Sequence, residues 1–162
     1  MMNLGSWALP AVAIEWIKEN FDCGSTILEL GSGQGTRVLA KDFKMISVEH
    51  DQAFVGKHNS KYIHAPIVGG WYDSQIIKDR IPSIDYDLLI VDGPPRVIGR
   101  EGMLFHLDLF RTDRPAIVDD AHTCLPVMDN LARHLNAIPD IRQCDLYSYR
   151  KFAILLPESR SG

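Results

Sequence analysis

The sequence has no apolar run long enough to cross a bilayer. Its unbroken apolar stretches are short, as at Leu88–Val91, whereas a membrane-spanning helix needs about 20 apolar residues. The first residues, Met1–Gly5, also lack the basic start and the long apolar stretch of a signal peptide. We therefore expect neither a membrane span nor export.

Cysteine motifs and an excess of basic residues are missing too. Cys23, Cys124 and Cys144 are odd in number and show no Cys-x-x-Cys pair or Cys/His ligand spacing. This usage predicts a reduced, cytoplasmic protein. The 17 Lys and Arg stand against 21 Asp and Glu, and the net charge of -4 argues against nucleic acid or anionic lipid as the main partner.

The chain is short, and its composition is that of an ordinary globular domain. With 162 residues, of which 46% are hydrophobic and 23% charged, it can build one core but has little room for a second. It contains no internal repeat, low-complexity segment or linker. We expect a single domain over residues 1–162.

Strand and helix patterns alternate along the chain. Ser6 is placed to cap an opening helix that ends near Asn20. Further helices are predicted at 36–43, 51–60, 100–110 and 126–135, and strands at 26–30, 45–49, 62–67, 86–91, 116–118, 142–147 and 151–156. The last two strands are too close in sequence for a crossover, so they should form an antiparallel hairpin. The pattern predicts an α/β, doubly wound, mostly parallel sheet with helices on both faces.

A glycine-rich loop follows the first predicted strand. The segment Gly31-Ser32-Gly33-Gln34-Gly35-Thr36 stands between that strand and a helix. Glycines there let a ligand approach the backbone, and the helix start offers free N–H groups. Glu49 ends the next strand, about 20 residues further on, where nucleotide-binding folds use an acid to accept the ribose hydroxyls. Two plainer interpretations stay open: a tight turn that needs glycine, and a solvated acid at a strand end.

These segments resemble the class I S-adenosylmethionine-dependent methyltransferases. Glu29–Thr36 looks like motif I of that family, and Ser47–Asp51 looks like its ribose-binding segment. Tyr86–Pro95 and Ile117–Asp120 are similar to its fourth-strand and fifth-strand motifs. The resemblance covers nearly the whole chain, and it implies a Rossmann-like seven-stranded sheet that ends in a C-terminal antiparallel hairpin.

The resemblance also implies which residues hold S-adenosylmethionine. Gly31 and Gly33 would pass beneath its methionine part, Glu29 would contact its amino group, and Glu49 would hold its ribose. Adenine would meet the turn His64–Pro66, where the acid of many relatives is missing. The full set of expected cofactor residues is Glu29, Gly31, Ser32, Gly33, Gly35, Thr36, Glu49, His50, Ala65 and Asp92.

Three carboxylates follow neighbouring strands of the expected sheet: Asp92 after the fourth, and Asp119 and Asp120 after the fifth. Carboxylates gathered there suit a hard cation such as Mg²⁺, and catechol O-methyltransferase-like members of the family place a metal at the matching positions. Those members usually carry a lysine where this chain has Pro95. The plainer interpretation is that these acids shape turns and cap backbone N–H groups.

Catalytic candidates lie in the same region. His122 follows the acidic pair and could deprotonate an acceptor, because the ordinary pKa of histidine is near neutrality; the alternative is a solvated loop histidine. Asp92 and Asp120 are the other candidates. Trp71 and Tyr72 follow two glycines. They could form a loop that covers the cofactor or stacks on a flat acceptor, or they could pack against a neighbouring helix or another subunit.

The expected function is methylation of an oxygen on a small molecule or sugar. One alternative is an NAD-dependent Rossmann oxidoreductase, although Gly35 comes one residue too early for the Gly-x-Gly-x-x-Gly fingerprint. Another is a binding protein of this fold that transfers nothing. A nucleic acid acceptor is disfavoured because Arg96 stands where an aromatic residue would stack on a flipped base.

The sheet and the cofactor loop leave few residues to build an acceptor pocket. These residues are Met1–Trp7, Pro66–Pro82 and Pro94–Gly99. A site covered by so little chain should be open, or it should be completed by a second subunit in a homodimer.

Overall fold

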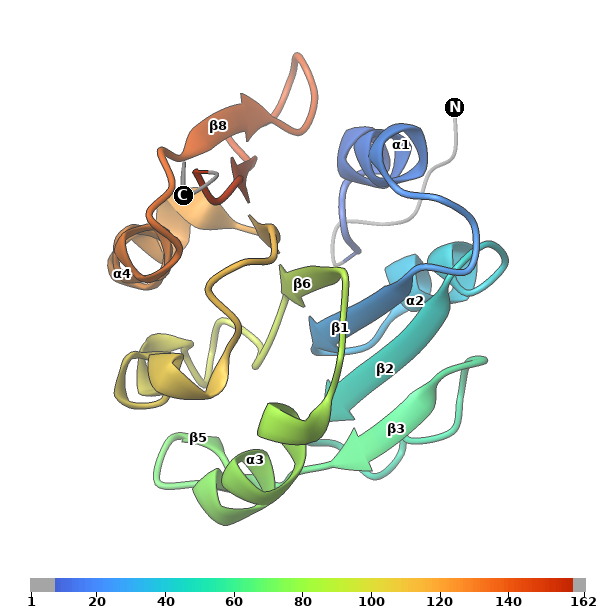
Figure 1. The fold of residues 1–162 in the computed structure, drawn as a ribbon, viewed down its shortest axis with the longest axis vertical. Helices are drawn as coiled ribbons and strands as arrows, with labels where there is room; N and C mark the ends of the chain where they lie inside the picture. Colours follow the sequence, from blue (N-terminus) through green and yellow to red (C-terminus); the bar gives the residue numbers. More distant parts are fainter. Residues whose placement is uncertain (1–7, 159–162) are drawn as a thin grey trace.

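The computed structural model describes residues 8–158, which form a seven-stranded sheet (Figure 1). Its parallel strands come in the order β3 (Lys61–His64), β2 (Lys44–Glu49), β1 (Thr26–Leu30), β6 (Leu88–Val91) and β7 (Ala116–Val118). The antiparallel β9 (Lys151–Leu155) follows β7, and β8 (Asp140–Gln143) forms the edge. The predicted mostly parallel sheet with its terminal antiparallel hairpin is confirmed.

One face of the sheet packs against α1 (Ala11–Asn20) and α2 (Gln34–Leu39). Alternate side chains of a strand point to opposite faces, so one set of residues from each strand meets these helices. On this face, Ile27, Met45, Ile90, Ile117 and Ile154 pack with Ile14 and Ile17 of α1 and with Val38 of α2. This packing holds α2 at the end of β1 and positions the glycine loop between them.

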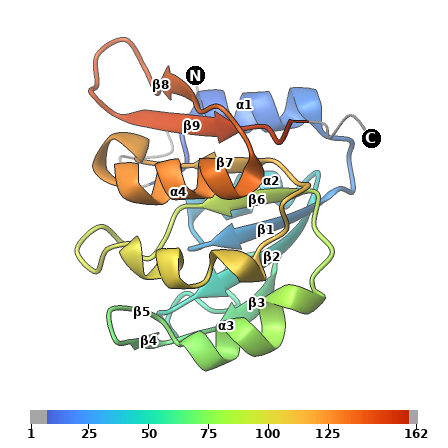
Figure 2. The same cartoon turned by 60° about the vertical axis from the view of Figure 1, so that its left-hand side comes forward.

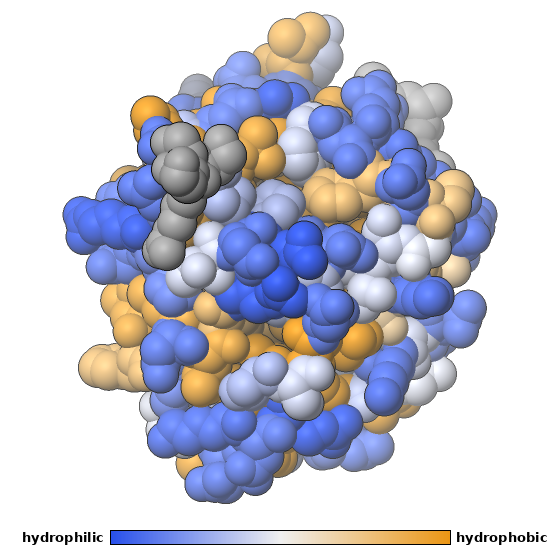
Figure 3. Space-filling model, in the orientation of Figure 1, coloured by the Kyte–Doolittle hydropathy of each residue, from blue (hydrophilic) through white to orange (hydrophobic). Residues whose placement is uncertain are grey.

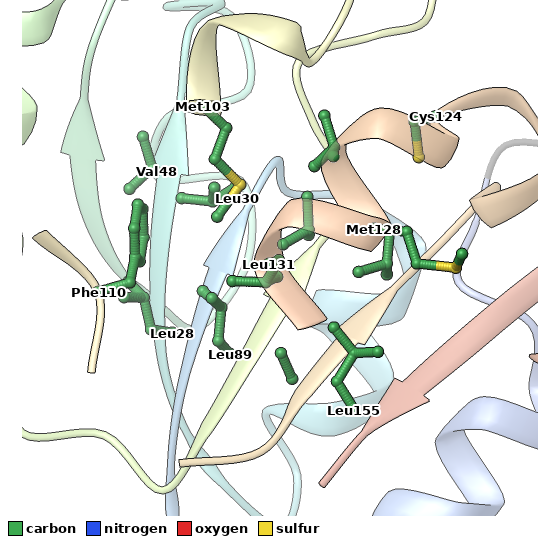
Figure 4. Packing of buried hydrophobic residues seen from close by; sticks show 14 of the residues in the cluster. Leu28, Leu30, Val48, Leu89, Met103, Phe110, Cys124, Met128, Leu131 and Leu155 are labelled. Atoms are coloured by element: carbon green, nitrogen blue, oxygen red, sulfur yellow. The ribbon is translucent and has the colours of Figure 1, made fainter. Parts of the chain in front are cut away.

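The opposite face is covered by α3 (Ser74–Arg80) and α4 (Leu125–Leu135), which lie in front of the sheet in Figure 2. Leu28, Leu30 and Val48 of the sheet lie in one cluster with Met128 and Leu131 of α4. Figure 4 shows these residues gathered between the helix and the strands. The prediction of helices on both faces is therefore confirmed.

Two predicted α-helices are wrong. Residues 51–60 form a series of turns, in which Asp51 Oδ1 accepts the N–H of Ala53. The segment has only two large apolar residues, Phe54 and Val55, and it contains Gly56, so it cannot bury a helical stripe. Residues 100–110 instead form two 3₁₀ turns, Glu101–Phe105 and Leu107–Leu109.

The segment after β3 is more regular than predicted. The predicted strand over 62–67 divides into β3 and a short strand β4 (Ile67–Val68), which pairs with β5 (Trp71–Tyr72). The helix α3 was not predicted, although Asp73 signals it: its side chain accepts the N–H groups of Gln75 and Ile76. The predicted Ser6 cap lies outside the described residues.

Trp71 and Tyr72 are core residues. Their side chains are 3% and 1% exposed, and the Trp71 ring stacks on His106 at 5.2 Å between centroids. Gly102 belongs to the same contact, because a Cβ there would stand 2.3 Å from Trp71 Cβ. Of the interpretations for this pair, packing against a neighbouring element is the one that the structure shows.

Within residues 8–158, no helix has the length and apolar character needed to span a membrane. The view in Figure 3 shows a surface with hydrophilic residues spread over most of it and apolar patches between them.

Candidate functional site

A cavity of about 430 Å³ lies at the carboxyl ends of β1, β2 and β6. Between β1 and β6 the winding of the sheet reverses, because the chain proceeds from β1 to β2 and β3 on one side and from β6 to β7 on the other. Open α/β sheets bind ligands at this reversal. The predicted residues that line the cavity are Gly31, Ser32, Gly33, Glu49, His50, Asp92 and Asp120.

The glycine loop forms one wall of the cavity. Gly31 has a φ of +90°, and a Cβ there would stand 2.8 Å from the Asp92 carbonyl oxygen. Glycine is therefore required for the close approach of the segments that follow β1 and β6. At Gly33, by contrast, no atom of residues 8–158 beyond its chain neighbours lies within 4 Å of the position that a Cβ would take, so the described backbone there is open to a ligand.

Glu49 lies beside this loop with its carboxylate almost fully buried, at 3% exposure. Its Oε2 accepts hydrogen bonds from Ser32 N (3.1 Å) and Ser32 Oγ (2.8 Å). Its Oε1 accepts one from Asp51 N (2.9 Å) and lies 3.0 Å from His50 Nδ1. With a proton on His50 Nδ1, four donors fill the lone-pair sites of this carboxylate. Two of them, the Ser32 hydroxyl and the His50 ring, are side chains that can rotate away.

Glu29 does not line the cavity. Its Oε1 accepts hydrogen bonds from Thr36 Oγ1 (2.6 Å) and Ser47 Oγ (2.5 Å) beneath the glycine loop. Burial raises the pKa of Glu29 to about 7, and these two hydrogen bonds oppose the shift only in part. Glu29 therefore supports the glycine loop from beneath, and its contact with the cofactor's amino group stays a prediction.

Three more expected cofactor residues stabilise the fold around the cavity and do not line it. Gly35 packs against Leu9, whose Cβ would lie 3.1 Å from a Cβ at residue 35. Thr36 Oγ1 accepts the N–H of Gly33 and thereby holds the loop. Ala65 is fully buried in the core below α3. None of the three is among the cavity-lining residues, because their side chains or Cα atoms face the core.

The candidate base His122 also lies outside the cavity lining. It is exposed, and its Nδ1 accepts the N–H of Lys151 at 3.2 Å. The structure therefore favours the alternative of a solvated loop histidine.

Asp92, Asp119 and Asp120 do lie together at the strand ends, but each forms an ion pair with an arginine there. Arg150 of the terminal hairpin pairs with Asp119 Oδ2 and, at 3.0 Å, with Asp120 Oδ1. Arg100 is 6% exposed, and its Nη2 lies 3.5 Å from Asp92 Oδ1. Burial and the nearby charge of Asp119 raise the pKa of Asp92 well above its ordinary value.

The predicted cation site is not formed by these carboxylates. Among residues 8–158, no group of three or more His, Cys, Asp or Glu side chains is placed to hold a metal ion. The residues present do not fit a divalent cation, because Arg100 and Arg150 already lie within ion-pair distance of all three carboxylates.

Several lining residues were not predicted as site residues. They are Ala8, Gln34, Phe54, Lys57, His58, Gly93 and Arg100. Phe54 and Lys57 come from the turns over 51–60, where the Lys57 ammonium lies 4.5 Å from the Phe54 ring centroid. No local sequence signal marks them, because they reach the cavity only through the fold of this irregular loop.

The segments expected to build the acceptor pocket contribute unequally. Pro95 and Arg96 of the segment 94–99 line the cavity, whereas residues 66–82 do not. Met1–Trp7 lies outside the described residues.

The chain matches no protein-family model and no curated protein. It is similar to a solved TehB-like S-adenosylmethionine-dependent methyltransferase from Corynebacterium glutamicum, with 14% identity and a TM-score of 0.59 over 90% of this chain and 86% of that one. It is also similar to an rRNA methylase from Streptococcus thermophilus, with 11% identity and a TM-score of 0.59 over 94% and 99% of the two chains.

A third similar structure is the MycE methyltransferase of the mycinamycin biosynthetic pathway, solved with Mg and S-adenosylhomocysteine. It has 15% identity and a TM-score of 0.54, and the match covers 90% of this chain but only 45% of MycE. At such identities the three likenesses show the fold, which is that of class I methyltransferases. They do not confirm the predicted likeness to catechol O-methyltransferase-like enzymes.

Proposed function

We propose that this chain, which has the class I methyltransferase fold, transfers a methyl group from S-adenosylmethionine. One observation carries the proposal: the cavity at the reversal between β1 and β6 is lined by both the open backbone of Gly33 and the carboxylate of Glu49. These are the two features that a ligand with a ribose and an amino acid part would need. The solved proteins of this fold that are named for S-adenosylmethionine support the same cofactor.

Glu49 would hold the ribose by exchanging hydrogen-bond donors. Its two backbone donors, Ser32 N and Asp51 N, are fixed by the loops. The Ser32 hydroxyl and the His50 ring would give way to the two ribose hydroxyls, so the carboxylate keeps four donors in both states. This exchange needs only rotation of two side chains.

Methyl transfer from a sulfonium needs alignment of donor and acceptor more than chemical activation. When bound, the cofactor supplies the activated methyl group. Asp92, Arg96, Arg100 and Asp120 line the wall beyond the glycine loop, where they would orient an acceptor oxygen. His122 lies outside this wall, so it is not proposed as the base.

We propose an oxygen of a small molecule or sugar as the acceptor. The sequence argument against nucleic acid is not supported, since an rRNA methylase has the same fold, and RNA belongs among the acceptors to be tested. We further propose that residues 1–162 act as one cytoplasmic domain, alone or as a homodimer. A divalent cation is not part of the proposal, because the aspartates do not fit it.

Calorimetry tests the cofactor. We expect S-adenosylmethionine and S-adenosylhomocysteine to bind, and NAD not to bind. Glu49→Gln should weaken binding by about tenfold to a hundredfold, because it replaces a charged acceptor for two hydroxyls with a neutral amide. Glu15→Gln, on the exposed side of α1, is the matched control and should bind normally. Tight binding of NAD without binding of S-adenosylmethionine would overturn the proposal in favour of an oxidoreductase.

Transfer itself is tested with methyl-labelled cofactor and separate pools of small molecules, sugars and RNA. Label transfer that Glu49→Gln removes would establish the enzyme and its acceptor class. Normal cofactor binding with no transfer to any pool would favour the alternative of a binding protein.

A further inference from the structure

Two arginines, the buried Arg100 and the partly buried Arg150, occupy the carboxylate cluster at the ends of β6 and β7. Arg150 donates from Nη2 to Asp119 Oδ2 and from Nε to Asp120 Oδ1. Arg100 donates from Nη1 to the Asp119 carbonyl oxygen at 2.6 Å, and its Nη2 lies 3.5 Å from Asp92 Oδ1 and 3.9 Å from Asp120 Oδ2. Each of the three carboxylates therefore has a guanidinium within ion-pair distance.

The remaining oxygen of Asp119 is used as well. Asp119 Oδ1 accepts the N–H of Asp120 at 2.9 Å, and the Asp119 side chain is fully buried. A magnesium ion needs carboxylate oxygens at about 2.0–2.1 Å in octahedral geometry, completed by waters. A magnesium ion that took Asp119 Oδ2 and Asp120 Oδ1 as ligands would displace Arg150 from both carboxylates.

Arg150 also joins two separate parts of the cavity wall to the terminal hairpin. Besides the two aspartates of the β7 turn, its Nη2 donates to the Ala8 carbonyl oxygen at 2.7 Å. Ala8 and Asp120 both line the cavity, whereas Arg150 itself belongs to the connection between β8 and β9. One guanidinium thus fixes the terminal hairpin, the β7 turn and the backbone at Ala8 against one another.

We propose that Arg100 and Arg150 are the fixed cations of this site and stand in the place of a divalent metal. Arg150 is a positioning residue: it holds Asp120, which has an unusual left-handed backbone conformation at φ 51°, in the cavity wall. A guanidinium suits this task because its planar fork can bond two carboxylates at once, which the single ammonium of lysine cannot do with the same geometry. Methyl transfer at this site then requires no added cation.

Thermal unfolding with and without MgCl₂ or MnCl₂, at matched ionic strength, tests the proposal. The melting temperature of the wild type should not respond to either cation. Arg150→Met leaves Asp119 and Asp120 with excess negative charge, so a cation should bind and raise the melting temperature of this variant by about 3 °C. Arg142→Met is the matched control, since Arg142 pairs only with the exposed Asp140 on β8 among the described contacts, and it should show no cation response.

Arg150→Lys separates charge from geometry and covers the case in which Arg150→Met does not fold. It keeps the positive charge but loses the double contact, so we expect no cation response and a dissociation constant for S-adenosylhomocysteine about threefold to tenfold higher than that of the wild type. A metal site in the wild type, seen as a saturable rise in its melting temperature, would overturn the proposal. So would a folded Arg150→Met that ignores cations, or an Arg150→Lys that binds S-adenosylhomocysteine normally.

The cation measurements need no cofactor or acceptor. Failure of the wild type to bind S-adenosylhomocysteine would therefore contradict the proposed function, whereas the melting temperatures alone would still decide whether the arginines replace a metal.

Discussion

Glu29 makes the stability of this protein depend on pH. Its carboxyl group is 4% exposed below the glycine loop and accepts hydrogen bonds from two hydroxyl groups. Burial disfavours its charged form and raises its pKa from 4.5 to about 7. The folded protein therefore keeps this proton over a pH range in which the unfolded chain has already released it.

The sign of the effect follows from proton counting. Between pH 4.5 and about 7, the unfolded state binds fewer protons at Glu29 than the folded state does, so the free energy of unfolding falls as pH rises. Below this range the burial of Glu29 does not lower the free energy of unfolding, and above this range the reduction is complete. A pKa difference of this size corresponds to about 3 kcal/mol.

Glu29→Gln removes the charge and keeps the shape of the side chain. Its amide oxygen can accept from Thr36 and Ser47 as the carboxylate does, but its NH₂ group has no acceptor supplied by the known contacts of Glu29, which costs about 1–2 kcal/mol. We expect the variant to be more stable than the wild type by about 1–2 kcal/mol at about pH 8, and less stable than the wild type at about pH 4.5.

Urea unfolding of both proteins at a series of pH values measures this difference. Glu15→Gln, an exposed change on α1, is the control and should follow the wild type at every pH. A difference between Glu29→Gln and the wild type that stays constant from about pH 4.5 to about pH 8 would refute the reasoning. In that case Glu29 would be ionised throughout, and the hydroxyl groups would fully offset its burial.

Two further changes test the packing that positions the site. Gly31→Ala should lower stability by about 2–4 kcal/mol, because it adds backbone strain at φ +90° and a contact of 2.8 Å with the Asp92 carbonyl oxygen. Gly24→Ala, at φ +88° with no other described atom beyond its chain neighbours within 4 Å of the new Cβ, adds the strain alone and should cost about 1 kcal/mol; equal losses in urea unfolding would contradict the close approach. Asp73→Ala should lower stability by about 1 kcal/mol because α3 loses its N-cap. An unchanged urea midpoint for this variant would mean that the cap contributes nothing.

The regular part of this fold is predictable because it depends on short-range patterns. The buried strand Leu88–Val91 and the glycine loop after β1 are visible as continuous segments, and their order along the chain fixes the reversal where the cavity forms. Residues 51–60 show the limit of this reasoning. Their backbone follows turns held by Asp51, and which side chains then reach the cavity depends on contacts between separate loops.

The acidic cluster shows the same limit at the level of chemistry. Its three aspartates were found from the sequence, since each follows a strand whose neighbour could be inferred. The arginine partners of these aspartates could not be predicted, because Arg100 and Arg150 follow irregular segments. A guanidinium can pair with any carboxylate that the fold brings near it. Only the fold brings Arg150 across from the terminal hairpin to Asp119 and Asp120.

This difference changes the chemical interpretation of the aspartates. Three carboxylates alone favour a divalent cation, whereas the same carboxylates paired with two arginines form an ion-pair network that holds the wall of a cavity. Such a network is costly to break from one side, because the loss of one arginine leaves buried negative charge without a partner. The terminal hairpin does not line the cavity. Through Arg150, it nevertheless positions the aspartates of the cavity wall.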